Sequence, residues 1–369
     1  MCVRFRFGRI AVLVSLGCTA LVRAQPTIIS IGLPPGSLGG VLRSLSADGD
    51  AATGEAYTGT GTTAYRWTRS GGTQNIGSLP GGNNGSGAGI SADGSVIAGT
   101  EFTGGARGFR WTSATGPVNI GSLPGGPGGC IPAGVSGDGS VIVGLAGSAN
   151  GPRAFRWTGG SGMQDLGTLP GGSRSEALAI STDASAVAGV SSSLGGDRAF
   201  RWSGGAGMQD LGVLFGGTSS LAFAISGDGS TVTGSGDSAV GTRAFRWTGS
   251  GGMQSLDIVS GYDSSEGYGV SGDGQAIVGG CASGIGSAAF LWTPALGMVD
   301  LNTYLPTIGV DLTGWTLDIG KGISADGSVI AGDGTFNGES MSFIITNVPA
   351  PGSAVLLGLG GLMAARRRR

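Results

Sequence analysis

Seven aspartates recur at one place in a repeated motif, which makes them candidates for metal binding. The motif is Ser-x-Asp-Gly, and its copies open 45 residues apart, with a longer step of 53 before the last copy. Calcium takes roughly six to eight oxygen ligands from several close carboxylates or carbonyls. Each copy supplies one motif aspartate, and only the first has a near second one, Asp50. A turn role is therefore favoured, and a calcium-stabilised array is the alternative. The aspartates are Asp48, Asp93, Asp138, Asp183 (in Ser-Thr-Asp-Ala), Asp228, Asp273 and Asp326.

Arginines form two further series at the repeat spacing. We expect the first series to stack on a neighbouring repeat with a carboxylate partner, and the alternative is a guanidinium ring for an anionic ligand. Leu291 and Ile344 take this place in the last two repeats. The second series is expected at a loop edge. The first series is Arg66, Arg110, Arg156, Arg201 and Arg246; the second is Arg107, Arg153, Arg198 and Arg243.

The residue types that the chain lacks exclude several kinds of active site. The sequence has no histidine, which excludes Ser-His-Asp, Cys-His and His-ligated zinc sites. It has neither a Gly-x-Ser-x-Gly elbow nor a Gly-x-x-x-x-Gly-Lys phosphate loop. Acidic pairs for glycoside hydrolysis could form between repeats, but the sequence marks no such pair. We expect no enzyme activity, no cofactor and no metal.

The charges are distributed unevenly along the chain. Four arginines lie in residues 1–24 and four more at 366–369, with no acidic residue in either segment. Without these eight arginines, 13 basic side chains face 23 acidic ones, a net charge of −10. Nucleic acid and anionic membrane surfaces are recognised by basic patches, so neither is an expected partner of the body of the chain.

The repeat unit predicts four antiparallel strands, which is the size of one propeller blade. Glycine is 80 of 369 residues, and Gly-rich turns separate short apolar runs. In one clean copy the expected strands are 133–136, 140–144, 154–157 and 163–167, with a tight turn at Asp138-Gly139. In the third strand Phe155 and Trp157 share one face, and we expect them to pack between blades.

The two ends of the repeat set indicate how the array closes. Residues 27–36 match the fourth strand of the unit, whereas the last copy, from Ser324 to Ile345, supplies only three strands. The first strand would then complete the last blade and hide the sheet edges. We therefore predict an all-β, closed seven-bladed β-propeller, with an open β-solenoid as the alternative. The insertion at 303–316 is expected to pack over one end of the ring, rather than bind a ligand.

The N-terminal segment 1–24 reads as a secretory signal peptide. Arginines precede the apolar run 10–22, and a small residue, Ala24, stands before Gln25, so cleavage is expected between these two. A transmembrane anchor is the alternative, but the run is shorter than the ~20 residues that span a bilayer. After cleavage Cys130 and Cys281 remain, and their separation by three repeats predicts two unpaired cysteines.

The C-terminal segment 348–369 reads as a three-part sorting signal. A short motif comes first, then the apolar run 353–365, and then a basic stop. The apolar run is short for a permanent span, which predicts transient membrane contact before processing. The motif is Val348, Pro349, Ala350, Pro351 and Gly352, and the stop is Arg366, Arg367, Arg368 and Arg369. The repeat domain between the two signals covers residues 25–347.

Two resemblances to known families agree with these patterns. Arg153–Trp157 and Gly162–Gly172 resemble the HAF family of probable extracellular repeats over about residues 27–346, with Arg153 where that family has its name-giving histidine. The tail resembles a PEP-CTERM sorting signal, with Ala350 in place of the usual glutamate. The second resemblance implies cleavage near Pro349–Pro351 by an exosortase in a Gram-negative-type envelope.

Together these features predict an exported protein of the cell surface or extracellular matrix. Its expected role is structural, adhesive or binding. The expected partners are the export machinery, an exosortase-type enzyme, and extracellular polysaccharide or surface proteins. The alternative function is a secreted polysaccharide-active enzyme with Asp or Glu at the propeller channel as acid and base.

Overall fold

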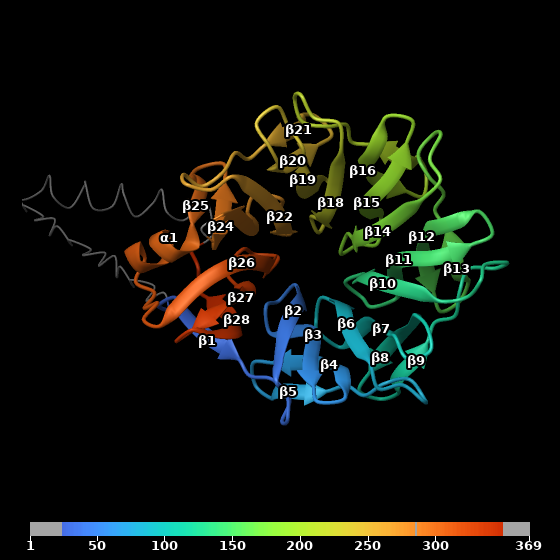
Figure 1. Cartoon of the computed structure of the whole chain (residues 1–369), viewed down its shortest axis with the longest axis horizontal. Coiled ribbons are helices and arrows are strands. Elements are labelled where there is room, and N and C mark those ends of the chain that lie inside the picture. The colour runs from blue at the N-terminus through green and yellow to red at the C-terminus, as the bar shows by residue number, and fades with distance from the viewer. Residues whose placement is uncertain (1–23, 285, 350–369) are drawn as a thin grey trace, which may run out of the picture.

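Seven four-stranded antiparallel sheets stand around a central channel in the computed structural model, which describes residues 24–284 and 286–349 (Figure 1). The predicted seven-bladed β-propeller is confirmed. The described residues form 28 strands and one short helix, α1. In each blade the first strand along the chain lies innermost and the fourth lies outermost, except that β1 supplies the outermost strand of the last blade.

Each blade is one copy of the repeat. Blades 1 to 4 comprise β2 (Gly39–Leu45), β3 (Ala51–Thr58), β4 (Gly61–Thr68) and β5 (Gly72–Asn75); β6 (Gly85–Ile90), β7 (Val96–Glu101), β8 (Arg107–Thr112) and β9 (Gly116–Asn119); β10 (Cys130–Val135), β11 (Val141–Ser148), β12 (Gly151–Thr158) and β13 (Gly162–Asp165); and β14 (Ser175–Ile180), β15 (Ala186–Ser193), β16 (Gly196–Ser203) and β17 (Gly207–Asp210). Blades 5 to 7 comprise β18 (Ser220–Ile225), β19 (Thr231–Gly236), β20 (Arg243–Thr248) and β21 (Gly252–Ser255); β22 (Ser264–Val270), β23 (Ile277–Ser283), β24 (Gly286–Thr293) and β25 (Gly297–Asp300); and β26 (Trp315–Ile323), β27 (Ile330–Phe336), β28 (Glu339–Thr346) and β1 (Thr27–Ile31).

The first strand closes the ring as predicted. β1 pairs antiparallel with β28, in a register that runs from Thr27 opposite Thr346 to Ile31 opposite Ser342. The sheet order β1-β28-β27-β26 therefore joins strands from the two ends of the repeat set. Ile31 is buried among residues of blades 1 and 7, so β1 also contributes to the core at this seam.

The first three strands of blade 3 are longer than the sequence predicted, and the fourth is shorter. In blade 3, β11 and β12 run up to a tight hairpin at Ser148–Gly151, whereas residues 145–153 were expected to form a loop. The stretch consists largely of glycine and other small residues, and these residues pair in register across the hairpin. The turn at Asp138-Gly139 lies where it was predicted, and β13 begins within one residue of the predicted fourth strand.

The core lies between the blades rather than inside any one of them. One large aromatic side chain per blade is fully buried against the neighbouring sheet, as predicted for Phe155. Trp157, which the sequence also placed there, is only partly buried at the edge of the same cluster. The seven buried rings are Tyr65, Phe109, Phe155, Phe200, Phe245, Phe290 and Phe343.

The insertion before the last blade packs on the outer side of the ring, which corrects the expected position over one end of the ring. It forms α1 (Leu301–Thr307), whose first turn is capped by the Asp300 carboxylate through the N–H of Asn302 at 2.8 Å. Leu301 and Leu305 are buried in the cluster between blades 6 and 7. Figure 1 shows α1 at the periphery beside β24 and β25, away from the channel.

The two remaining cysteines are free and buried, as predicted. Burial raises the pKa of the Cys130 thiol to about 11, which disfavours the reactive thiolate. Cys2 and Cys18 lie outside the described residues. Within residues 24–284 and 286–349, no helix is long and apolar enough to cross a bilayer.

Candidate functional site

The central channel has two ends with different walls. At one end lie the Ser-x-Asp-Gly turns, and we call this end the turn face. At the other end lie the loops that cross from one blade to the next, and we call it the crossover face. A cavity of about 230 Å³ lies toward the turn face, and a cavity of about 440 Å³ opens toward the crossover face.

A closed chain of backbone hydrogen bonds joins the seven turns at the turn face. In each turn the residue after the motif serine, or the aspartate that follows it, donates its N–H to a carbonyl of the next turn. Ala325 of blade 7 donates to Ala47 of blade 1 at 2.8 Å, which completes the circle. The acceptors around the ring are Ala92, Gly137, Thr182, Gly227, Gly272, Ala325 and Ala47. This face of the channel is therefore a structural seam between all the blades.

The motif aspartates hold these turns in shape, as the favoured interpretation predicted. In blade 3 the Asp138 carboxylate accepts from the Ser136 hydroxyl at 2.7 Å and from the Ser140 N–H at 3.0 Å. The Ser136 hydroxyl oxygen in turn accepts the N–H of Val141 at 3.0 Å. The same bonds recur in the other six turns. Among the described residues no three His, Cys, Asp or Glu side chains come together as a metal site would need.

We expect the propeller to lose stability in acid because of these turns. Hydrogen bonds from Ser136 and Ser140 lower the pKa of Asp138 from 3.8 to about 2, and similar bonds lower the pKa of Asp93 and Asp228. A depressed folded-state pKa means that the unfolded chain binds more protons, so this stability is present above pH 3.8 and is lost as pH falls toward 2. Thermal unfolding from pH 6 to pH 2 measures the loss. Asp138→Asn should flatten the profile, and a slope equal to that of the parent would contradict the prediction.

The first arginine series links neighbouring blades through carbonyls, which corrects the expected carboxylate partner. Arg66 Nε donates to the carbonyl of Gly94 in the next blade at 2.7 Å, and Arg201 Nε does the same to Gly229 at 2.7 Å. Arg110 and Arg246 make the equivalent bonds. The guanidinium groups of these four arginines are therefore engaged at the turns between the blades.

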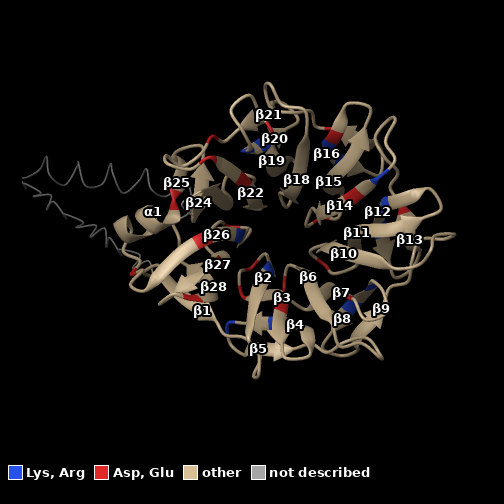
Figure 2. Cartoon of the chain, viewed as in Figure 1, with Lys and Arg blue, Asp and Glu red and all other residues tan. Residues whose placement is uncertain are grey.

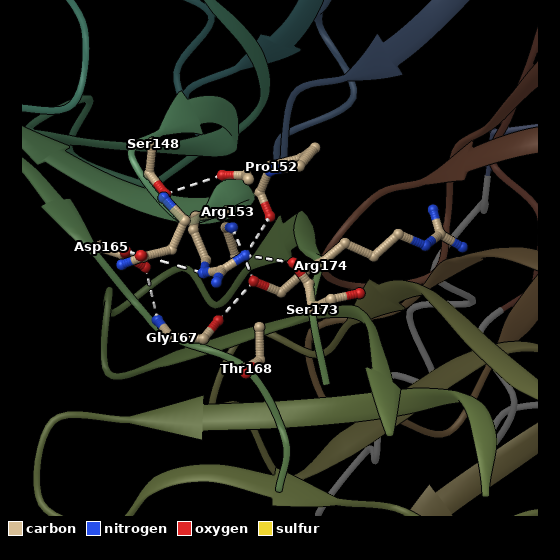
Figure 3. A network of polar contacts seen from close by, with 12 residues as sticks. Ser148, Pro152, Arg153, Asp165, Gly167, Thr168, Ser173 and Arg174 are labelled. Carbon is tan, nitrogen blue, oxygen red and sulfur yellow. Dashed lines mark hydrogen bonds and ion pairs between the residues drawn. The ribbon is translucent and has the colours of Figure 1, made fainter. Parts of the chain in front are cut away.

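The second arginine series lies at the crossover face, at loop edges as predicted. Figure 3 shows Arg153 of β12 between Asp165 of β13 and the loop that enters blade 4. Its Nη1 donates to the carbonyl of Ser173 at 2.5 Å, and its Nε lies 4.0 Å from the Asp165 carboxylate. Arg198 and Arg243 reach the entering loop of the next blade in the same way, whereas Arg107 bonds to the loop of its own blade.

A β-bulge in every innermost strand turns one side chain into the channel. In every blade the pairing of the first and second strands skips the residue at one shared position, as between Ala222 and Ala224 in blade 5, and blade 7 has a second irregularity at Asp318. The shared position always lies three residues before the motif serine, and its seven residues line the channel cavities. These residues are Arg43, Ala88, Ala133, Leu178, Phe223, Tyr268 and Lys321. The channel wall is thus set by a position that varies between the repeats.

Two cations meet on one side of this ring, where blade 7 joins blade 1. Arg43 of β2 pairs with Glu55 at 2.9 Å, and Lys321 of β26 pairs with Asp333 at 2.5 Å. Lys321 Nζ also donates to the carbonyl of Leu42 across the seam at 2.9 Å. Figure 2 shows basic and acidic residues side by side on the channel ends of these blades. Each cation is thus paired with a carboxylate of its own blade, and the bond from Lys321 to Leu42 joins the two blades.

Two aromatic rings form the wall on blades 5 and 6. Phe223 of β18 and Tyr268 of β22 stack, with ring centroids 5.2 Å apart and planes 24° from parallel. The Tyr268 hydroxyl donates to the Glu266 carboxylate, and burial with this carboxylate raises the pKa of Tyr268. Figure 1 shows β18 across the channel from β2. The mouth at the crossover face therefore has an aromatic side and a charged, hydrogen-bonding side.

The sequence did not mark this site, although a signal for it was present. The positions that stay constant between the repeats hold the turns and the core, and they give the strongest signal in the sequence. The side chain that faces the channel comes from the variable position three residues before each motif serine. A prediction that assumes strict alternation of strand faces does not include the bulge at this position. Arg, Lys, Tyr and Phe at a position that is otherwise Ala or Leu were the available clue.

The sequence-predicted processing residues lie at the seam of the ring. Ala24 and Gln25 are exposed just before β1, and Pro349 follows β28 after Val348, which is buried against the ring. The Asn347 side-chain amide donates to the carbonyl of Gln25 at 3.2 Å, so the two places lie side by side. Ala350, Pro351, Gly352 and Arg366 to Arg369 lie outside the described residues.

Comparison with known proteins supports the fold alone. No family model matches the chain, and no curated protein is similar to it in sequence. An oligogalacturonate lyase in complex with manganese superposes with a TM-score of 0.57 at 12% identity, over 87% of this chain and 93% of that one. An oligogalacturonate lyase from Vibrio parahaemolyticus gives 0.55 at 10% identity, over 88% and 99%. TolB from Acinetobacter baumannii gives 0.47 at 19% identity over 70% of this chain, which spans only 62% of that protein.

Proposed function

We propose that this chain is an exported cell-surface or extracellular-matrix protein whose propeller binds its partners without transforming them. The observation that carries the proposal is the position of the two processing points. Every strand that closes the ring lies between Thr27 and Thr346, and Gln25 and Asn347 are joined outside it. Removal of both signals would therefore leave the propeller complete. The acidic, histidine-free body supports a role outside the cell without catalysis.

The intact mass of the mature protein from fractionated native cells tests export and sorting. We expect a chain that starts at Gln25 and ends near Pro349–Pro351, recovered from the surface or matrix fraction. Changing Arg366 to Arg369 to serine should leave the tail uncleaved, whereas Arg174→Ser, at an exposed ion pair of the ring, should have no effect on processing. A native chain that still ends at Arg369 and stays in the inner membrane would overturn the sorting proposal.

A polysaccharide-active enzyme is the second candidate, because carboxylates line the mouth of the channel. Glu55 lines the cavity, and Asp333 and Glu266 bond to cavity-lining residues. Each carboxylate already has a partner, so an acid or base role would need that partner to be released. We therefore favour binding. Incubation with oligosaccharides, followed by mass spectrometry for shortened products, separates the two candidates.

A further inference from the structure

The mouth of the channel at the crossover face has the properties of a ligand site. Its cavity of about 440 Å³ falls within the range of about 300–1,000 Å³ that is typical of small-molecule sites. Seven of its lining side chains are set by bulges in the innermost strands, so the sheets hold these side chains in place before a ligand arrives. Of the seven channel-facing bulge positions, four carry large side chains capable of stacking or hydrogen bonding.

We propose that this mouth binds a neutral oligosaccharide, with the stacked Phe223 and Tyr268 as the platform for a sugar ring and Arg43 and Glu55 as hydrogen-bonding partners for its hydroxyls. This inference rests on the proposed function of a binding propeller and names its ligand class and its face. A pyranose has an apolar C–H face that suits an aromatic ring, and a rim of hydroxyls that both donate and accept. The two sides of the mouth supply these two kinds of contact.

The charges of the mouth favour a neutral ligand over an acidic one. Arg43 and Lys321 are each paired with a carboxylate, at 2.9 and 2.5 Å, so an anionic sugar that approached either cation would also meet the negative charge of Glu55 or Asp333. Glu266, bonded to the hydroxyl of Tyr268, adds a further negative charge beside the platform. Two cations therefore stand against three carboxylates, so like-charge repulsion disfavours an acidic sugar relative to a neutral one. A hydroxyl can bond to the same groups without breaking either pair.

Calorimetric titration of the full chain with cellohexaose, mannohexaose, galactohexaose and hexagalacturonate tests the proposal. We expect at least one neutral hexamer to bind more tightly than hexagalacturonate, with a Kd unchanged between about 0.05 and 0.5 M salt, because no charge pair forms. Tighter binding of hexagalacturonate with strong salt dependence would overturn the neutral-sugar assignment. So would the failure of all three neutral hexamers at about 10 mM, where even a Kd near 1 mM is visible.

Variants locate the binding at the aromatic platform. Phe223→Ala should weaken binding of the neutral hexamer about tenfold or more, the change that corresponds to about 1.4 kcal/mol. Phe215→Ala is the matched control, because Phe215 is a crossover-face aromatic that is 94% exposed and outside the channel. Phe223→Leu keeps most of the volume and guards against misfolding of the alanine variant. Equal affinity of Phe223→Leu and the parent, with both folded, would place the ligand elsewhere.

The outcome is separable from the proposed export and sorting. The mass of the mature protein depends on its two terminal signals, whereas sugar binding depends on residues of β2, β18 and β22. Loss of binding with correct processing would overturn the ligand class alone.

Discussion

A variant that lacks residues 25–36 is expected to lose about 5 kcal/mol or more of its free energy of unfolding and to aggregate. Removal of β1 breaks a five-residue ladder to β28, and each backbone hydrogen bond contributes about 1 kcal/mol net. It also removes Ile31, whose side chain is 2% exposed, and loss of a buried isoleucine costs about 2–5 kcal/mol. The exposed edge of β28 would then be free to pair with other chains. Urea unfolding and light scattering measure both effects.

Two controls separate closure of the ring from loss of sequence in general. Ile31→Ala keeps the ladder and should lose only the side-chain part, about 2–5 kcal/mol, without aggregation. Ile29→Ala, at an exposed position of the same strand, should change stability by less than about 0.5 kcal/mol. If the truncated chain unfolded at the same urea concentration as the parent, the ring would not depend on β1.

The constant positions of the repeat made the fold predictable from sequence. The Ser-x-Asp-Gly spacing set the number of blades, and the unmatched fourth strand at residues 27–36 predicted how the ring closes. The buried ring of each blade followed from period-2 placement of Phe155 and its equivalents. These features recur because each blade packs against two neighbouring blades of the same kind.

The site was hidden because it depends on departures from regular strand geometry. Strict alternation would place Phe223 on a sheet face, but the bulge between Ala222 and Ala224 turns it toward the channel. The hydrogen bond from Lys321 to the carbonyl of Leu42 depends on which blades meet at the seam, and the chain separates these residues by 279 positions. The carbonyl partners of the arginines could not be predicted from the sequence either, because every residue has a backbone carbonyl and the sequence does not mark which one accepts.

In each blade, one glycine of the second strand lies opposite the bulge, and its lack of a side chain permits the bulge. In blade 5 this is Gly234, which pairs with Ala222 at the start of the bulge. A Cβ on Gly234 would lie 1.9 Å from the carbonyl oxygen of Leu221, far inside van der Waals contact. The equivalent glycines meet the same obstacle in the other blades: Gly54, Gly99, Gly144, Gly189, Gly279 and Gly332. The shape of the channel wall therefore depends on glycine at this position.

Gly234→Ala is expected to destabilise the propeller by about 3 kcal/mol or more, at the upper end of overpacking costs, because only backbone movement can relieve the contact. Gly160→Ala is the matched control: a Cβ there would meet nothing within 4 Å, so stability should change by less than about 0.5 kcal/mol. Urea unfolding gives both values. Where Gly234→Ala still folds, the displaced β18 should carry Phe223 away from Tyr268 and weaken sugar binding as Phe223→Ala does. A stable Gly234→Ala protein with full affinity would show that the bulge does not aim the platform.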